Sequence, residues 1–144
     1  MSKIEDLSNF MNGSIEEAQA NYKNDLRIFP DVKVMKIGGQ SITDRGRKAV
    51  FPILDELIEN NDKHNFILTS GGGTRARHAY QVGIDLNMPV GVLAEMGGAV
   101  TVQNARMLQM LLAKHGGIFL DHLEFEKIPL FLKLGCIPVL PGMP

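Results

Sequence analysis

The segment Val32-Lys33-Val34-Met35-Lys36-Ile37-Gly38-Gly39 has the composition of a β-strand that ends in a tight turn. Its β-branched residues favour an extended backbone, and the two glycines favour a turn. The same unit recurs at Phe66-Ile67-Leu68-Thr69, which is followed at once by Ser70-Gly71-Gly72-Gly73. A helical pattern of apolar residues comes after each glycine cluster. This alternation of strand, glycines and helix predicts an α/β fold with a mainly parallel sheet.

The two helices after the glycine clusters are predicted from apolar residues three or four positions apart. Thr43 or Asp44 is placed to cap the start of the first helix. Pro52 lies inside its pattern, so we expect a kink or a later start. The apolar positions of the first helix are Ala49, Val50, Ile53, Leu54, Leu57 and Ile58, and those of the second are Ala76, Ala79, Val82 and Leu86.

The rest of the chain continues the alternation. The sequence predicts a short strand at 90–93, the longest helix at about 98–114, a strand at 118–120, a short helix at 128–134 and a last strand at 137–140. Two consecutive glycines end the long helix, as glycines commonly do. Its inward face should carry Val102, Ala105, Leu108, Leu111 and Leu112.

Length, charge and cysteine content exclude several classes of protein. The 144 residues suffice for one domain or part of one. The chain has 15 Lys and Arg against 16 Asp and Glu and no lysine-rich run, so nucleic acid is not expected as the main partner. No apolar run approaches the roughly 18 residues of a membrane span, and no signal peptide is recognisable. A single cysteine, Cys136, excludes an intramolecular disulfide. These features predict a cytoplasmic protein.

Two regions differ in composition. Residues 1–30 are polar, and a few apolar residues among the first eleven suggest a short amphipathic helix that needs a partner surface. Residues 31–144 form the folded domain. Because the chain stops just after its last strand, at the sheet edge where open α/β folds bind ligands, we expect the N-terminal half of a larger domain. The alternative is a complete domain whose last strand lies at the sheet edge, which Pro138 would suit.

The glycine clusters carry the first candidate site. Their backbone N–H groups can approach a ligand closely, and the helices that follow add positive partial charge, a combination that binds anions. Lys36, two residues before the first cluster, could reach phosphate oxygens. Arg75, Arg77 and His78 lie in the first turn of the second helix, where cations oppose the helix dipole. A bound anion would explain them; alternatively, the arginines are solvated or paired with acids such as Asp85.

Other polar side chains give a second set of candidates. His122 follows a predicted strand on the ligand-binding side of the sheet and could contact an oxyanion. Gln103 and Asn104 lie in the middle of the long helix, where they are either solvated or turned toward a ligand. The histidines show neither a pair four residues apart nor an H-E-x-x-H motif, so no zinc or iron site is predicted and the metal ligands stay unassigned.

Two motifs in this order resemble the amino acid kinase superfamily: Lys36-Ile37-Gly38-Gly39 after the first strand, and Ser70-Gly71-Gly72-Gly73 with Arg77 after the second. Within the superfamily the chain looks most like the molybdenum storage branch, which is related to the uridylate kinases. The likeness covers about residues 28–144. It is carried by Met35-Lys36-Ile37-Gly38-Gly39-Gln40-Ser41, Asp44-Arg45-Gly46-Arg47, Gly73-Thr74-Arg75-Ala76-Arg77-His78, Val102-Gln103-Asn104-Ala105 and Leu111-Leu112-Ala113-Lys114-His115-Gly116.

The resemblance implies a three-layer αβα sandwich, of which this chain supplies the N-terminal half. It implies that ATP binds with Mg²⁺, and that Lys36 is the catalytic residue, in contact with the γ-phosphoryl group. The adenine pocket and a second lysine belong to the C-terminal half, so this chain by itself should not be a competent kinase. The candidates for binding phosphate or nucleotide are Lys36, Gly38, Gly39, Gln40, Gly71, Gly72, Gly73, Arg75 and Arg77.

The storage branch holds molybdate or tungstate as oxometalate clusters inside a cage. The resemblance therefore implies a homo- or hetero-oligomer, hexamer-like, in which His78, Gln103 and His122 are candidates for contact with the oxyanion. The alternative is a uridylate kinase-like phosphotransferase, in which Glu95 stands one position away from the ribose-binding aspartate of those enzymes. A third reading is a non-catalytic half-domain that serves in assembly.

Overall fold

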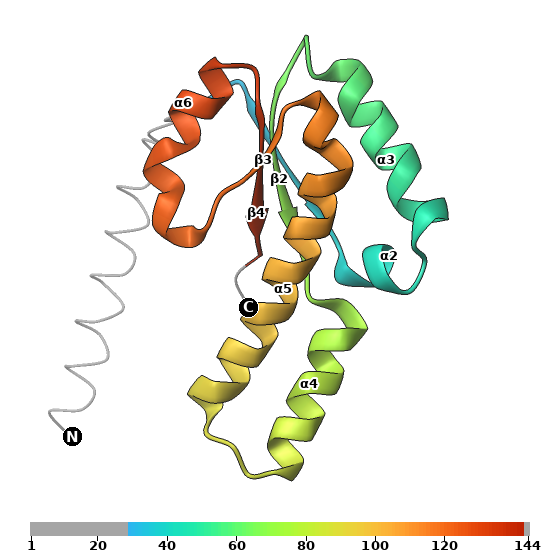
Figure 1. The fold of residues 1–144 in the computed structure, drawn as a ribbon, viewed down its shortest axis with the longest axis vertical. Helices are drawn as coiled ribbons and strands as arrows, with labels where there is room; N and C mark the ends of the chain where they lie inside the picture. The colour runs from blue at the N-terminus through green and yellow to red at the C-terminus, as the bar shows by residue number, and fades with distance from the viewer. Residues whose placement is uncertain (1–28, 143–144) are drawn as a thin grey trace, which may run out of the picture. The chain divides into compact units, whose positions relative to one another are not determined.

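The computed structural model describes residues 29–142 and alternates strands with helices as expected. The predicted N-terminal extension lies outside the described residues except for Phe29 and Pro30, and so stays a prediction. The elements follow one another as β1 (Val32–Ile37), α2 (Gly39–Thr43), α3 (Arg47–Asn60), β2 (Asn65–Ser70), α4 (Gly73–Asp85), α5 (Val90–Leu112), η1 (Ala113–His115), β3 (Gly117–Phe119), η2 (His122–Lys127), α6 (Ile128–Lys133) and β4 (Ile137–Pro141) (Figure 1).

The four described strands form one parallel sheet in the order β1-β2-β4-β3. The last strand is therefore interior, and the alternative that placed it at the edge of the sheet is wrong. Pro138 is tolerated because Ile137 N donates to Gly116 O and Val139 O accepts from Leu120 N, which completes the bonds to β3. Pairing with β2 begins only at Val139, so the missing N–H of Pro138 costs no ladder bond.

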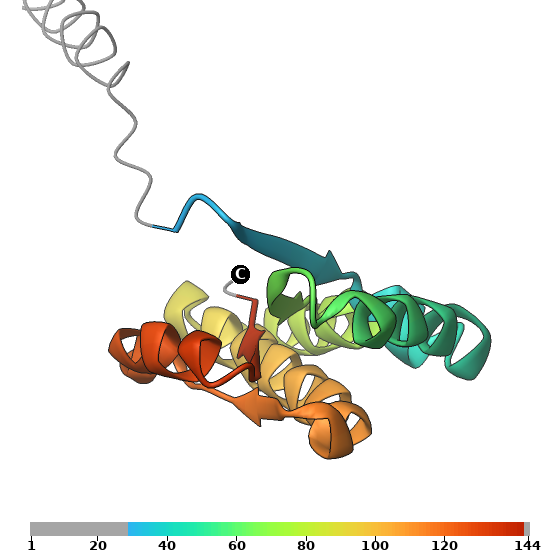
Figure 2. The ribbon, with the colours of Figure 1, turned by 90° about the horizontal axis from the view of Figure 1, so that it is seen from above.

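Helices cover both faces of the sheet, which confirms the three-layer arrangement (Figures 1 and 2). On one face, apolar residues of α3 and α5 pack against the strands. On the other, α6 packs against β2 and β4. The first core contains Leu54, Leu57, Leu108, Leu112, Leu68 and Val139, among others, and the second contains Ile67, Leu120, Leu132 and Leu140.

The predicted strand at 90–93 is wrong, because these residues form the first turn of α5, which begins 8 positions before the predicted start at about 98. Pro89 stands at the N-cap, where its missing N–H is harmless. The adjacent glycines 97 and 98 look like a break in the sequence. In the structure Gly97 is buried under the ring of Tyr80 from α4, so the glycine allows the two helices to approach without ending α5.

Other expectations concern the ends of the helices. Thr43 and Asp44 close α2, so the expectation that one of them caps α3 is wrong. Gly46 is the residue before α3, and the later start that Pro52 led us to expect is confirmed. Val82, Leu86 and Leu111 are exposed instead of inward. The first two lie where the α4–α5 hairpin extends beyond the strands, so no sheet surface is available to cover them (Figure 1).

The two adjacent glycines of α5 should respond oppositely to alanine. A Cβ on Gly97 would lie 1.9 Å from Tyr80 Oη and 2.4 Å from its Cζ, so the ring must leave the interhelical contact. We expect Gly97→Ala to lower the free energy of unfolding by about 1–3 kcal/mol. A Cβ on Gly98 meets nothing within 4 Å, and Gly98→Ala should raise it by about 0.5–1 kcal/mol. Urea denaturation measures both, and equal stabilisation by the two substitutions would contradict the contact.

Candidate functional site

The two glycine clusters meet at the carboxyl edge of the sheet, because β1 and β2 are parallel neighbours that end in register at Ile37 and Ser70. The Gly71 N–H donates to Ile37 O at 2.9 Å, which ties the second turn to the first. A Cβ on Gly39 would lie 2.3 Å from Gly73 N, so the two backbones pack directly against each other. Gly73 also has φ +67°, a conformation that favours glycine.

Both turns open a helix, and both helices begin without a side-chain cap. Gly38 precedes α2 and Gly72 precedes α4. The first backbone N–H groups of any helix lack an intrahelical acceptor. In α2 the N–H of Ser41 already donates to Gly38 O, so those of Gly39 and Gln40 and the first ones of α4 are left for a ligand. The 13-residue α4 adds positive partial charge at the same place.

Two cavities, of about 320 and 330 Å³, surround these turns and share Lys36, Arg77 and the second glycine cluster. Among the described residues, the basic side chains that lie within 4 Å of a carboxylate are His122, beside Asp121, and Lys127, beside Glu124, so no described carboxylate lies within 4 Å of Lys36 or Arg77. Neither cavity is lined by a carboxylate of the described residues. The first is lined by Lys36, Ser70, Gly71, Gly72, Gly73, Ala76, Arg77, Tyr80, Thr101 and Gly142, and the second by Lys36, Gly38, Gly39, Gln40, Ser41, Arg45, Gly71, Gly72, Gly73 and Arg77.

The structure separates Arg75 and His78 from Arg77. They line a third cavity of about 450 Å³, together with Asp44, Thr74, Ala79 and Val100. The helical turn of about 100° per residue explains this, since positions 75 and 78 share one side of α4 and position 77 faces another. In this cavity the Asp44 carboxylate accepts from Thr74 Oγ1 at 2.6 Å and from Thr43 Oγ1 at 3.1 Å. Gln40 Nε2 donates to Thr74 Oγ1 at 3.4 Å.

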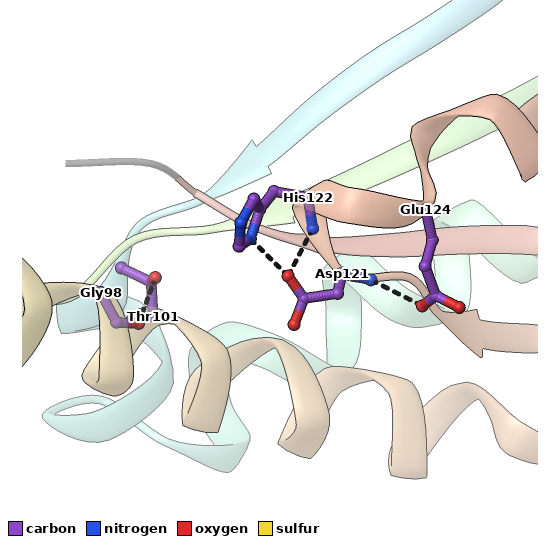
Figure 3. Close-up of polar contacts among 5 residues, drawn as sticks. All are labelled: Gly98, Thr101, Asp121, His122 and Glu124. Atoms are coloured by element: carbon purple, nitrogen blue, oxygen red, sulfur yellow. Dashed lines mark hydrogen bonds and ion pairs between the residues drawn. The ribbon is translucent and has the colours of Figure 1, made fainter.

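His122 lines a fourth cavity, of about 330 Å³, with Glu95, Thr101 and Pro141 among its other residues. Thr101 also lines the first cavity, so the two are neighbours along α5. The Nδ1 atom of His122 faces the Asp121 carboxylate, which also accepts from His122 N at 2.6 Å (Figure 3). An imidazole held through Nδ1 keeps Nε2 free for a ligand.

The turn that carries His122 is stabilised by a capping box. Asp121 N donates to Glu124 Oε2 at 3.2 Å, while Asp121 caps the first turn of η2 (Figure 3). The hydrogen bond from Lys127, together with that from Asp121 N, lowers the pKa of Glu124 below its ordinary value. Glu124 therefore stays ionised at neutral pH, as the capping box requires.

The structure decides between the two polar residues in the middle of α5. Gln103 is exposed and lines none of the four cavities described above, so its proposed contact with an oxyanion stays a prediction. Asn104 is fully buried, and its Nδ2 donates to Gly71 O at 2.7 Å. The sequence held a signal for this burial, because Asn104 is three residues after the buried Thr101 and four before the buried Leu108, on the apolar stripe of the helix.

Comparison with known proteins agrees with this geometry. The family model described as "Amino acid kinase family" matches residues 31–144. The chain belongs to the amino acid kinase family. It is 45% identical over 128 residues to the molybdenum storage protein subunit beta of Azotobacter vinelandii (strain DJ / ATCC BAA-1303), which covers 89% of this chain and 47% of that protein. The chain thus spans about half the length of that relative.

Two further properties concern the described residues alone. None of the helices between residues 29 and 142 is both long and apolar enough to cross a membrane. Within the same range, no group of three or more His, Cys, Asp or Glu side chains is arranged to hold a metal ion. The polar side chains of the two glycine cavities are mainly hydrogen-bond donors and cations, which suit an oxyanion, whereas Asp44 lines the cavity of Arg75 and His78, and Glu95 and Asp121 line that of His122.

Proposed function

We propose that this chain binds the phosphates of ATP and holds molybdate or tungstate as oxometalate clusters within an oligomeric cage. The observation that carries the proposal is the lining of the two glycine cavities. Lys36, Arg77 and the uncapped first turns of α2 and α4 supply cations and N–H donors, without a described carboxylate to oppose them. The similarity to a molybdenum storage protein subunit supports the storage role.

The proposal assigns different oxyanions to neighbouring cavities. The triphosphate of ATP fits the glycine cavities, because backbone N–H groups and cations neutralise phosphoryl oxygens. No carboxylate of the described residues lines these cavities, so Mg²⁺ would arrive bound to the phosphates of ATP. The adjoining cavity offers the free Nε2 of His122 to an oxometalate. Arg75 and His78 add cations on the other side of α4, in a cavity that the Asp44 carboxylate also lines.

The decisive experiment measures the metal content of the chain. Full-length protein from cells grown with molybdate is purified and analysed by elemental mass spectrometry, and its assembly is measured by analytical ultracentrifugation. We expect many molybdenum atoms per chain in a closed oligomer. A metal-free preparation would rule out the storage role. ADP release that depends on UMP would instead favour the uridylate kinase-like alternative, for which Glu95 lines the cavity beside the phosphate site.

His122→Ala is expected to lower the molybdenum content of the purified chain at least about tenfold, since the imidazole that Asp121 orients toward the ligand is lost. Stability should change little, because the His122 side chain is about half exposed. His64→Ala is the matched control. That histidine lines a cavity on the α3 side of the sheet, away from the glycine turns. Equal molybdenum content in wild type and His122→Ala would show that His122 does not contribute to molybdate binding.

A further inference from the structure

Asn104 is a polar side chain on the buried stripe of α5, where Ala105, Leu108 and Leu112 are also fully buried. Its Nδ2 donates to Gly71 O at 2.7 Å and lies 3.5 Å from Gly72 O. Its Oδ1 has no hydrogen-bond partner among the described residues. A residue kept only for packing would be better replaced by leucine, because an unpartnered buried oxygen is costly. The role of this side chain therefore lies in its Nδ2 donor, which binds the carbonyl of Gly71.

The two carbonyls that Asn104 contacts determine where the next two N–H groups point. In a trans peptide the C=O of one residue and the N–H of the following residue point in opposite directions. No described peptide bond is cis. With the carbonyls of Gly71 and Gly72 turned toward Asn104, the N–H groups of Gly72 and Gly73 turn away from it. Both glycines line the two phosphate cavities.

In the second glycine turn, the N–H groups of Gly72 and Gly73 are the ones still free to donate to a ligand. The N–H of Gly71 is used by Ile37 O. Gly72 and Gly73 stand at the start of α4, where no side chain caps the helix. Rotation of either peptide would withdraw a donor from the cavities and place a carbonyl oxygen there, which repels an anion. The direction of the two peptides thus decides whether the turn attracts or repels phosphate.

We propose that Asn104 is a positioning residue that aims the N–H groups of Gly72 and Gly73 at the bound oxyanion. The inference rests on the proposed function, since it names what orients the donors of that site. Asn104 does not touch the ligand. It acts through the glycine peptides, in the way that partners behind a binding group orient that group.

The test compares Asn104→Leu with Gln109→Leu in the full chain. Gln109 is a matched control, because it also lies on α5 and donates its side-chain amide to a glycine carbonyl, Gly117 O, at 3.2 Å. That carbonyl is at the start of β3, at the opposite end of the strands from the site. The probes are MgATP and molybdate, with affinity measured by calorimetry and stability by thermal unfolding.

Asn104→Leu should weaken the binding of both probes about tenfold or more, whereas Gln109→Leu should lower the melting temperature with wild-type affinity. Asn104→Asp is the second variant, nearly equal in size, which replaces the donor by an oxygen and should weaken binding at least as much. Wild-type affinity in folded Asn104→Asp would overturn the proposal. So would an affinity loss in Gln109→Leu that matches the loss in Asn104→Leu.

A readout without ligand separates this inference from the proposed function. With ¹⁵N-glycine labelling, the amide resonances of Gly72 and Gly73 should shift in both Asn104 variants and stay in place in Gln109→Leu. Unchanged resonances in the Asn104 variants would overturn the positioning role even if binding were lost. If the wild-type chain binds neither probe, the proposed function fails, and the glycine resonances alone decide the role of Asn104.

Discussion

Gly39→Ala is expected to force the two glycine turns apart and to abolish anion binding. The new Cβ would lie 2.3 Å from Gly73 N, 2.4 Å from Gly72 C and 2.5 Å from Gly71 O. All three atoms are backbone, and Gly71 is itself hydrogen-bonded to Ile37, so no side chain can move aside to make room. We expect the free energy of unfolding to fall by about 2–4 kcal/mol, measured by urea denaturation. Binding of MgATP and molybdate should become undetectable.

Gly38→Ala provides the matched control for this prediction. A Cβ on Gly38 meets nothing within 4 Å, and the backbone there has φ −63°, which any residue adopts. The stability of Gly38→Ala should stay within about 0.5 kcal/mol of wild type. If the two alanine variants lose the same amount of stability, the close backbone contact between the turns is not what holds the site together.

The strands and the glycine turns could be predicted from the sequence because the signals for them are local. β-branched residues followed at once by glycines mark the ends of β1 and β2, and the helical periodicity marks α3 and α6. Parallel pairing then brings the carboxyl ends of the strands together, so Lys36 and the glycine clusters share one site.

The predictions that were wrong, for residues 90–93 and for Pro138, concern features that depend on contacts between segments distant in sequence. The residues at 90–93 are helical because α5 continues through Gly97, and Gly97 is explained only by the ring of Tyr80 lying against it. Likewise, nothing local to Pro138 reveals that its missing N–H falls outside the ladder with β2. Tertiary packing overrides local propensity at both positions.

The residues of the candidate site and their division between cavities could be predicted from the sequence, but the hydrogen-bond partners of Asn104 could not. Counting along α4 at 100° per residue already separates Arg77 from Arg75 and His78, and the structure places the two groups in different cavities. Asn104 shares the spacing of the apolar stripe, which predicts burial. Its partners, Gly71 and Gly72, are 33 and 32 residues away, and no spacing rule identifies them.

Lys36→Met is expected to remove most of the affinity for MgATP while leaving the fold intact. Methionine preserves the aliphatic stem that passes Gly71, where a Cβ would lie 3.7 Å from Lys36 Cε, and removes only the charged end. A charged hydrogen bond to phosphate is worth about 1.5–3 kcal/mol, so the dissociation constant should rise about 10- to 100-fold. Calorimetry at fixed ionic strength measures this change.

The stability of Lys36→Met should not fall with its affinity, and this difference distinguishes a ligand-binding lysine from a structural one. Lys36 is exposed, has no described carboxylate within 4 Å, and shares its cavities with Arg77 and the positive end of α4. Removing one of these like charges relieves repulsion, so the unliganded protein should melt at the same temperature or slightly higher.

Lys33→Met is the matched control for the loss of affinity. It removes the same charge from the same strand, on the α3 side, and should leave MgATP affinity unchanged. A loss of affinity equal in the two variants would mean that the effect is one of overall charge, and that Lys36 does not contact the phosphates.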